Sequence, residues 1–127
     1  MRGLQVKPFA IALLVMSMGL SGCASSRGAY DWGEYDELLY QSYKDPSKIE
    51  ALRIGLEEHL VALESSNGLV APGLYADLGT LYLEAGDTEG AILFYEKERA
   101  AWPESKYLMD ALITNLERRR PNQQEAP

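Results

Sequence analysis

One stretch of the chain, residues 72–105, limits the possible fold more than any other. Its small, aromatic and leucine residues recur at intervals of three and four within each predicted helix, which places them on one helix face. They are Tyr75, Leu78, Gly79, Tyr82, Ala91 and Tyr95, and Pro103 follows them. Gly79 and Ala91 have the small side chains that two helices need in order to approach closely. The pattern therefore predicts a helical hairpin that ends near Pro103, because proline interrupts helical hydrogen bonding.

This pattern resembles the tetratricopeptide repeat, which carries W-x₂-L-G-x₂-Y, then A-x₃-F, then P. Tyr75 and Tyr95 stand at the tryptophan and phenylalanine positions, and Glu98 stands where the family usually has a small residue. We expect Glu98 to loosen the packing against the following helix. A generic two-helix hairpin is the alternative. Residues 31–64 match poorly, with Gly55 at the position of Tyr95, so they form either a degenerate repeat or an unrelated hairpin.

Apolar residues with helical spacing cover the rest of residues 30–120, and no long run alternates with a period of two. We predict an all-α domain, a short tetratricopeptide-like helical-repeat array of about five helices. The expected helices are 31–43, 47–64, 72–85, 87–101 and 103–119, and residues 121–127 are expected to be disordered.

The predicted helix ends rest on residues that favour such positions. Ser47 and Glu50 match a capping box, and Pro72 suits the first position of a helix. Gly86 suits a left-handed helix end, and Asp87 is expected to cap the next helix.

The N-terminal region has the layout of an export signal. Arg2 and Lys7 precede an apolar run, and residues 20–23 are Leu-Ser-Gly-Cys. This end of the run resembles the bacterial lipobox. It implies that residues 1–22 are removed and that Cys23 carries a diacylglyceryl group and an N-acyl group. An ordinary secretory signal with an incidental cysteine is the alternative. Residues 23–29 would then be a short lipidated linker.

The charge of the chain limits its partners. Cleavage after residue 22 removes Arg2 and Lys7 but no acidic residue, so the formal net charge changes from −7 to −9. Such a domain gains nothing electrostatically from an anionic leaflet or from nucleic acid. We therefore expect attachment to the membrane through the lipid alone. Ala24 follows Cys23, and the resemblance to lipoproteins implies the periplasmic face of the outer membrane.

Several short motifs resemble a small family of bacterial lipoproteins, designated domain of unknown function 4810. The motifs lie within residues 30–112 and include Tyr30-Asp31-Trp32-Gly33, Pro72-Gly73, Glu96-Lys97-Glu98 and Trp102-Pro103-Glu104-Ser105. The resemblance brings no catalytic residue and no cofactor. Family members are often encoded beside a lipoprotein that resembles the curli secretion channel component. The resemblance therefore implies a partner protein in the envelope, and that neighbouring lipoprotein is one candidate.

The chain offers few residues for catalysis. His59 is the single histidine, and it lies at the edge of an apolar helix face, where we expect it to be half-buried and hydrogen-bonded. Paired carboxylates such as Glu57 and Glu58 are common on charged helix surfaces. We expect no enzyme activity and no metal site.

The sequence thus favours a lipid-anchored, non-catalytic protein-interaction module of the bacterial envelope. By resemblance to the repeat family, the partner groove would contain Gly73, Ala76, Asp77, Thr80 and Glu84. None of these is basic, so a neutral or basic partner is expected. The alternative function is binding to peptidoglycan or another glycan through an aromatic surface of Tyr30, Trp32 and Tyr35.

Overall fold

The computed structural model describes residues 28–123, and in this range the chain is helical with no strand. The α-helices are α2 (Tyr35–Lys44), α3 (Ile49–Ser65), α4 (Leu74–Glu84), α5 (Thr88–Ala101) and α6 (Lys106–Gln123). Short 3₁₀ turns, η2 (Pro46–Lys48) and η3 (Pro103–Ser105), precede α3 and α6. The predicted all-α class and the five helices of the domain are confirmed.

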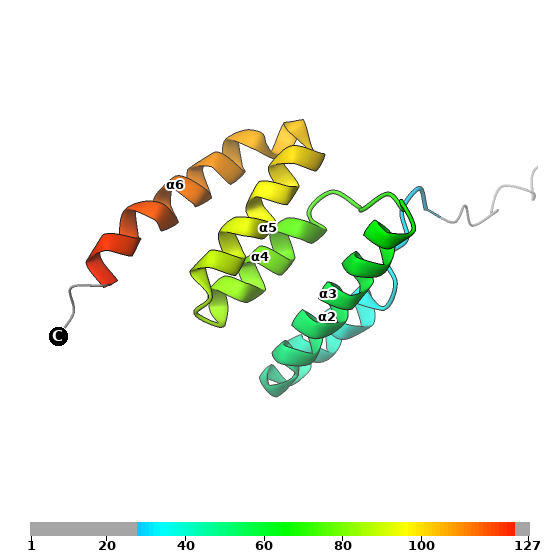
Figure 1. Ribbon diagram of the computed structural model, residues 1–127. Coiled ribbons are helices and arrows are strands. Elements are labelled where there is room, and N and C mark those ends of the chain that lie inside the picture. Colours follow the sequence, from blue (N-terminus) through cyan, green and yellow to red (C-terminus); the bar gives the residue numbers. More distant parts are fainter. Residues whose placement is uncertain (1–27, 124–127) are drawn as a thin grey trace, which may run out of the picture.

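Consecutive helices pack against one another in a row. α2 pairs with α3 and α4 pairs with α5, while α3 contacts α4 and α5 contacts α6. Figure 1 shows the two hairpins side by side, with α6 along the far edge of the second hairpin. This arrangement is consistent with a short helical-repeat array.

Two clusters of buried side chains hold the row together. The first joins α3 to α4 and consists mainly of Leu52, Leu56, Leu60, Leu63, Leu74, Leu78 and Leu81. The second joins α5 to α6 and consists of Ala91, Ile92, Tyr95, Met109, Ile113 and Leu116. The apolar residues that recur with helical spacing along α3 and α4 are therefore in the core. Ile49 is the exception, because it is 42% exposed at the start of α3.

The second hairpin packs closely at Gly79, as predicted. A Cβ atom placed on Gly79 would lie 2.9 Å from the Tyr95 ring and 3.1 Å from the carbonyl oxygen of Ala91. Any larger residue would push α4 and α5 apart.

The predicted starts of two helices are wrong. α2 begins at Tyr35 rather than at Asp31, because the Asp31 carboxylate accepts a hydrogen bond from the Gly33 N–H and Gly33 has a φ of +54°. α4 begins after Gly73, whose φ of +95° is not helical, so Pro72 lies before the helix.

The predicted capping box at Ser47 is also wrong. The carboxylate of Asp45 accepts hydrogen bonds from the N–H and the hydroxyl of Ser47, at 3.0 Å and 2.7 Å, and this starts the turn before α3. α6 ends at Gln123 rather than near Arg119, so residues 121–123 of the expected tail are helical. The remainder of that tail lies outside the described residues.

The predicted connection between α4 and α5 is confirmed. Gly86 has a φ of +84°, and the N–H of Asp87 donates to the carbonyl of Tyr82. The Asp87 carboxylate accepts a hydrogen bond of 2.8 Å from the Gly90 N–H at the start of α5.

Glu98 does not loosen the packing as expected. Its side chain is 1% exposed, and its Oε1 accepts hydrogen bonds from the Gly73 N–H at 2.9 Å and from the Ser105 hydroxyl at 3.1 Å. Glu98 therefore ties α5 to the segments that precede α4 and α6. A buried carboxylate that is hydrogen-bonded in this way stabilises the connections.

Candidate partner groove

An open groove of about 350 Å³ lies between α2 and α4, the first helices of the two hairpins. Its lining consists of Tyr35, Leu39, Ser42, Tyr43, Ile49, Leu52, Asp77, Thr80, Leu81 and Glu84. Leu52 and Leu81 are buried and form an apolar floor, whereas Tyr43 is 81% exposed at the rim. The groove can thus accommodate an apolar side chain next to polar groups.

Three of the five residues predicted to form the groove line it. Thr80 and Glu84 lie three and seven residues after Asp77, which places all three on one face of α4. The other two lie elsewhere. Gly73 precedes α4 and donates its N–H to Glu98, and Ala76 packs against the cluster between α5 and α6.

Asp77 also holds the two hairpins together. Its carboxylate accepts a hydrogen bond of 2.6 Å from the hydroxyl of Tyr35 on α2. Burial and this hydrogen bond raise the pKa of Tyr35 above its ordinary value, since both favour the neutral phenol. Asp77 is therefore partly structural, and its replacement would affect the position of α2.

Glu84 provides the free charge of the groove. It is exposed, and it forms no hydrogen bond or ion pair with another residue between 28 and 123. Arg53 lies beside Glu84 in an adjoining hollow but is engaged by Glu50 and Glu57. No lysine or arginine lines the groove itself, so its electrostatic character is acidic.

The three residues of the predicted aromatic surface do not form one exposed surface. The Tyr30 ring packs edge-on against Trp102, with 5.9 Å between the ring centroids. Tyr35 lines the groove, and its ring lies 6.2 Å from that of Trp32. Trp32 is 39% exposed, whereas Tyr30 and Tyr35 are partly buried against the core. These residues mainly attach the N-terminal segment to the domain.

Sequence reasoning missed the contribution of the first hairpin to the groove. Leu39, Tyr43 and Ile49 line it together with Tyr35. Tyr35, Leu39 and Tyr43 are four residues apart in succession, so they lie along one side of α2. That spacing would have identified the face of α2, but only the fold shows that this face lies opposite α4.

His59 has the environment expected from the sequence. It is half-buried, and its Nε2 lies 2.9 Å from the carbonyl oxygen of Asp31, next to Gly33. It therefore fixes the segment before α2. In residues 28–123, no group of three or more histidine, cysteine, aspartate or glutamate side chains is placed to hold a metal ion.

The predicted signal peptide, Cys23 and most of the linker lie outside the described residues. Within the described part of the chain, no helix is long and apolar enough to cross a membrane.

Comparison with known proteins identifies a family. The family model described as Domain of unknown function (DUF4810) matches residues 29–112, which span both hairpins and the first part of α6. No curated protein and no solved structure matches the chain. Because the matched region covers more than half of the sequence, the chain belongs to the DUF4810 family.

Proposed function

We propose that this protein is a lipid-anchored, non-catalytic interaction module of the bacterial cell envelope that holds a protein partner in the groove between α2 and α4. The observation that carries the proposal is the groove itself, with its apolar floor and acidic rim between two hairpins. Lipidation would occur at Cys23, and the protein would face the periplasm from the outer membrane.

The chemistry of the groove favours a neutral or basic segment as the partner. Leu52 and Leu81 offer an apolar surface, and Tyr43 provides an exposed ring at the rim. The Glu84 carboxylate has no partner among the described residues, so it can bind a cation or a hydrogen-bond donor. The resemblance to the family makes a neighbouring lipoprotein, similar to the curli secretion channel component, a candidate partner.

The groove is tested by reversing a charge that the fold does not need. Glu84→Lys places a cation beside the partner and should lower its recovery from envelope extract by about fivefold or more, because like charges repel across an interface. Asp77→Asn keeps an acceptor for the Tyr35 hydroxyl while removing the charge, and it should lower recovery less.

Glu58→Lys is the matched control, because Glu58 is exposed on α3 and does not line the groove. Circular dichroism should show the same helix content in all three variants. Equal recovery of the partner by Glu84→Lys and Glu58→Lys would exclude the groove as the electrostatic binding site of a basic partner.

The anchor is tested separately. The Cys23→Ser variant should remain an unlipidated precursor, because serine cannot form the thioether. Incorporation of labelled palmitate into this variant would refute the lipid attachment, and recovery of the wild-type protein in the inner-membrane fraction would refute the proposed location.

Binding to a glycan remains the second candidate function, and it depends on Trp32. This residue has an exposed ring next to Tyr35. Sedimentation of the protein with purified peptidoglycan sacculi, lost in Trp32→Ala, would support a glycan-binding role. Sedimentation that does not depend on Trp32, or no sedimentation, would argue against it.

A further inference from the structure

Three segments that are distant in the sequence meet at one end of the helical row. Because successive helices run in opposite directions, this end collects the segment before α2, the α3–α4 connection and the α5–α6 connection (Figure 1). The Tyr30 ring contacts Trp102, and Glu98 accepts hydrogen bonds from Gly73 and Ser105. We call residues 28–34, 66–73 and 102–108 the anchor end.

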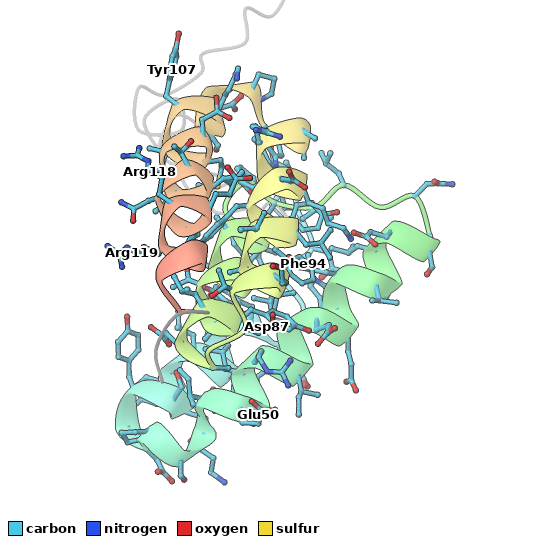
Figure 2. All side chains as sticks on the ribbon, turned by 60° about the vertical axis from the view of Figure 1, so that its left-hand side comes forward. Glu50, Asp87, Phe94, Tyr107, Arg118 and Arg119 are labelled. Atoms are coloured by element: carbon cyan, nitrogen blue, oxygen red, sulfur yellow. The ribbon has the colours of Figure 1, made fainter. Side chains whose placement is uncertain are left out.

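Large apolar side chains are exposed in each of these segments. Trp32 is 39% exposed, Leu69 60%, Tyr107 88% and Leu108 61%. Figure 2 shows Tyr107 pointing away from the helices, whereas Glu50 and Asp87 lie toward the opposite end. Tryptophan and tyrosine combine an apolar ring with a polar atom, which suits the boundary between lipid and water.

The connection to Cys23 leaves the domain at this same end. Gly28 lies five positions after Cys23, and five residues span at most about 18 Å. The opposite end lies roughly 25 Å away along α3, a helix of 17 residues. A short linker therefore keeps the anchor end, and not the opposite end, close to the lipid.

We propose that the anchor end rests on the membrane surface, with Trp32, Leu69, Tyr107 and Leu108 in contact with the lipid. This placement rests on the proposed lipidation of Cys23. It directs the rim of the partner groove away from the membrane, because Tyr43 and Glu84 lie near the opposite ends of their helices. A partner in the periplasm can then reach the groove.

The charge of the anchor end defines the lipid that it fits. Glu34 and Glu104 are exposed, and Lys106 is paired with Asp110 at 2.6 Å. No net positive charge is available to bind anionic headgroups, so the contact is apolar. It should be strongest on zwitterionic bilayers and weaker when anionic lipid is added.

The test uses the full chain, purified in its acylated form and inserted into vesicles of phosphatidylethanolamine and phosphatidylcholine that contain a headgroup-quenching lipid. A fluorophore is attached at Glu104→Cys in the anchor end or at Lys48→Cys in the opposite end. The thioether leaves Cys23 without a free thiol. Quenching should be about threefold greater at position 104, because only that end lies in the interface.

The lipid on Cys23 would by itself bring position 104 nearer to the membrane, so a separate variant is needed to test the apolar contact with lipid. Tyr107→Ser with Leu108→Ser should reduce quenching at position 104 by about half, since these side chains supply the apolar contact. Tyr40→Ser with Tyr43→Ser is the matched control, because these rings are 53% and 81% exposed on α2 toward the other end.

The outcomes separate the two proposals. Acylated protein with equal quenching at both positions, or with quenching unaffected by the change at Tyr107 and Leu108, would overturn the placement and leave the anchor intact. A mass spectrum without acyl groups on Cys23 would overturn the anchor and the placement together.

Discussion

The two hairpins place small residues at their close contacts in different ways. In the second hairpin, Gly79 on the first helix lies against the Tyr95 ring, and Gly90 on the second helix lies against the Tyr82 ring. In the first hairpin, the small residue is Gly55 on the second helix, and Leu38 of the first helix lies against it. The comparison shows that the close approach requires a small residue opposite a large one, on whichever helix each stands.

The hairpins also differ in how readily each contact can give way. Gly79 faces the Tyr95 ring and the backbone oxygen of Ala91, and the backbone oxygen cannot move without displacing α5. Gly55 faces only the end of the Leu38 side chain, which can adopt another rotamer. The second hairpin should therefore be the less tolerant of substitution.

The largest effect is expected from Gly79→Leu. The added side chain must displace the Tyr95 ring or separate α4 from α5, which should lower the free energy of unfolding by about 1–3 kcal/mol or more. Urea denaturation followed by circular dichroism measures this change. An unchanged midpoint would show that α4 and α5 do not meet at Gly79 as described.

A somewhat smaller effect is expected at Glu98, which braces the second hairpin. Glu98→Ala leaves the Gly73 N–H and the Ser105 hydroxyl without their acceptor and should cost about 1–3 kcal/mol. Glu98→Gln is the control, because it keeps one acceptor oxygen. The Oε2 atom that it replaces has no hydrogen-bond partner among the described residues. Equal losses of stability in the two variants would contradict the bracing role.

Sequence patterns predicted the second hairpin well because its contacts are local. Gly79, Ala91 and Tyr95 lie within one hairpin, and Gly86 and Asp87 act on their immediate neighbours. The first hairpin was left undecided, because a fixed repeat pattern does not show that Gly55, which stands at the position of Tyr95, lies against the Leu38 side chain. The role of Glu98 depends on Gly73, which is 25 residues away, and no local pattern indicates that pairing.

The groove was predictable only in part, for the same reason. Asp77, Thr80 and Glu84 follow from the helical period of α4. The opposing wall depends on where α2 lies relative to α4, and the Tyr35–Asp77 hydrogen bond joins residues 42 positions apart. Cys23, the other main site prediction, lies outside the described residues and stays a prediction.

Tyr35→Phe tests the link between the two hairpins. Loss of the hydrogen bond to Asp77 should lower the free energy of unfolding by about 1 kcal/mol, because the pair is only partly buried. Tyr43→Phe is the matched control, since Tyr43 is 81% exposed and forms no hydrogen bond with another described residue. Equal stability of the two variants would show that the link contributes nothing.

The same variant should change the response to alkaline pH. The pKa of Tyr35 is raised in the folded protein, so its contribution is fully present below the ordinary value of 10.0 and is lost as the pH rises above it. Stability should therefore decline less steeply above pH 10.0 in Tyr35→Phe than in the wild type. Urea midpoints measured at pH values on both sides of 10.0 provide the check, and parallel declines would refute the assignment.

The smallest effect is expected from Gly55→Ala, and its comparison with Gly79→Ala is the sharpest test of the difference between the hairpins. Alanine is favoured over glycine inside a helix by about 0.8–1 kcal/mol at either position. At Gly55 this gain is offset by a shift of the Leu38 side chain, which costs about 0.5–1.5 kcal/mol, so the net change should stay within about 0.5 kcal/mol. At Gly79 the added methyl meets the Tyr95 ring and the Ala91 carbonyl, so overpacking should outweigh the same gain by about 1 kcal/mol. Urea denaturation of both variants gives the two values side by side. If Gly55→Ala proved the more damaging, the contact with Leu38 would be the rigid one and the order of tolerance proposed for the two hairpins would be reversed.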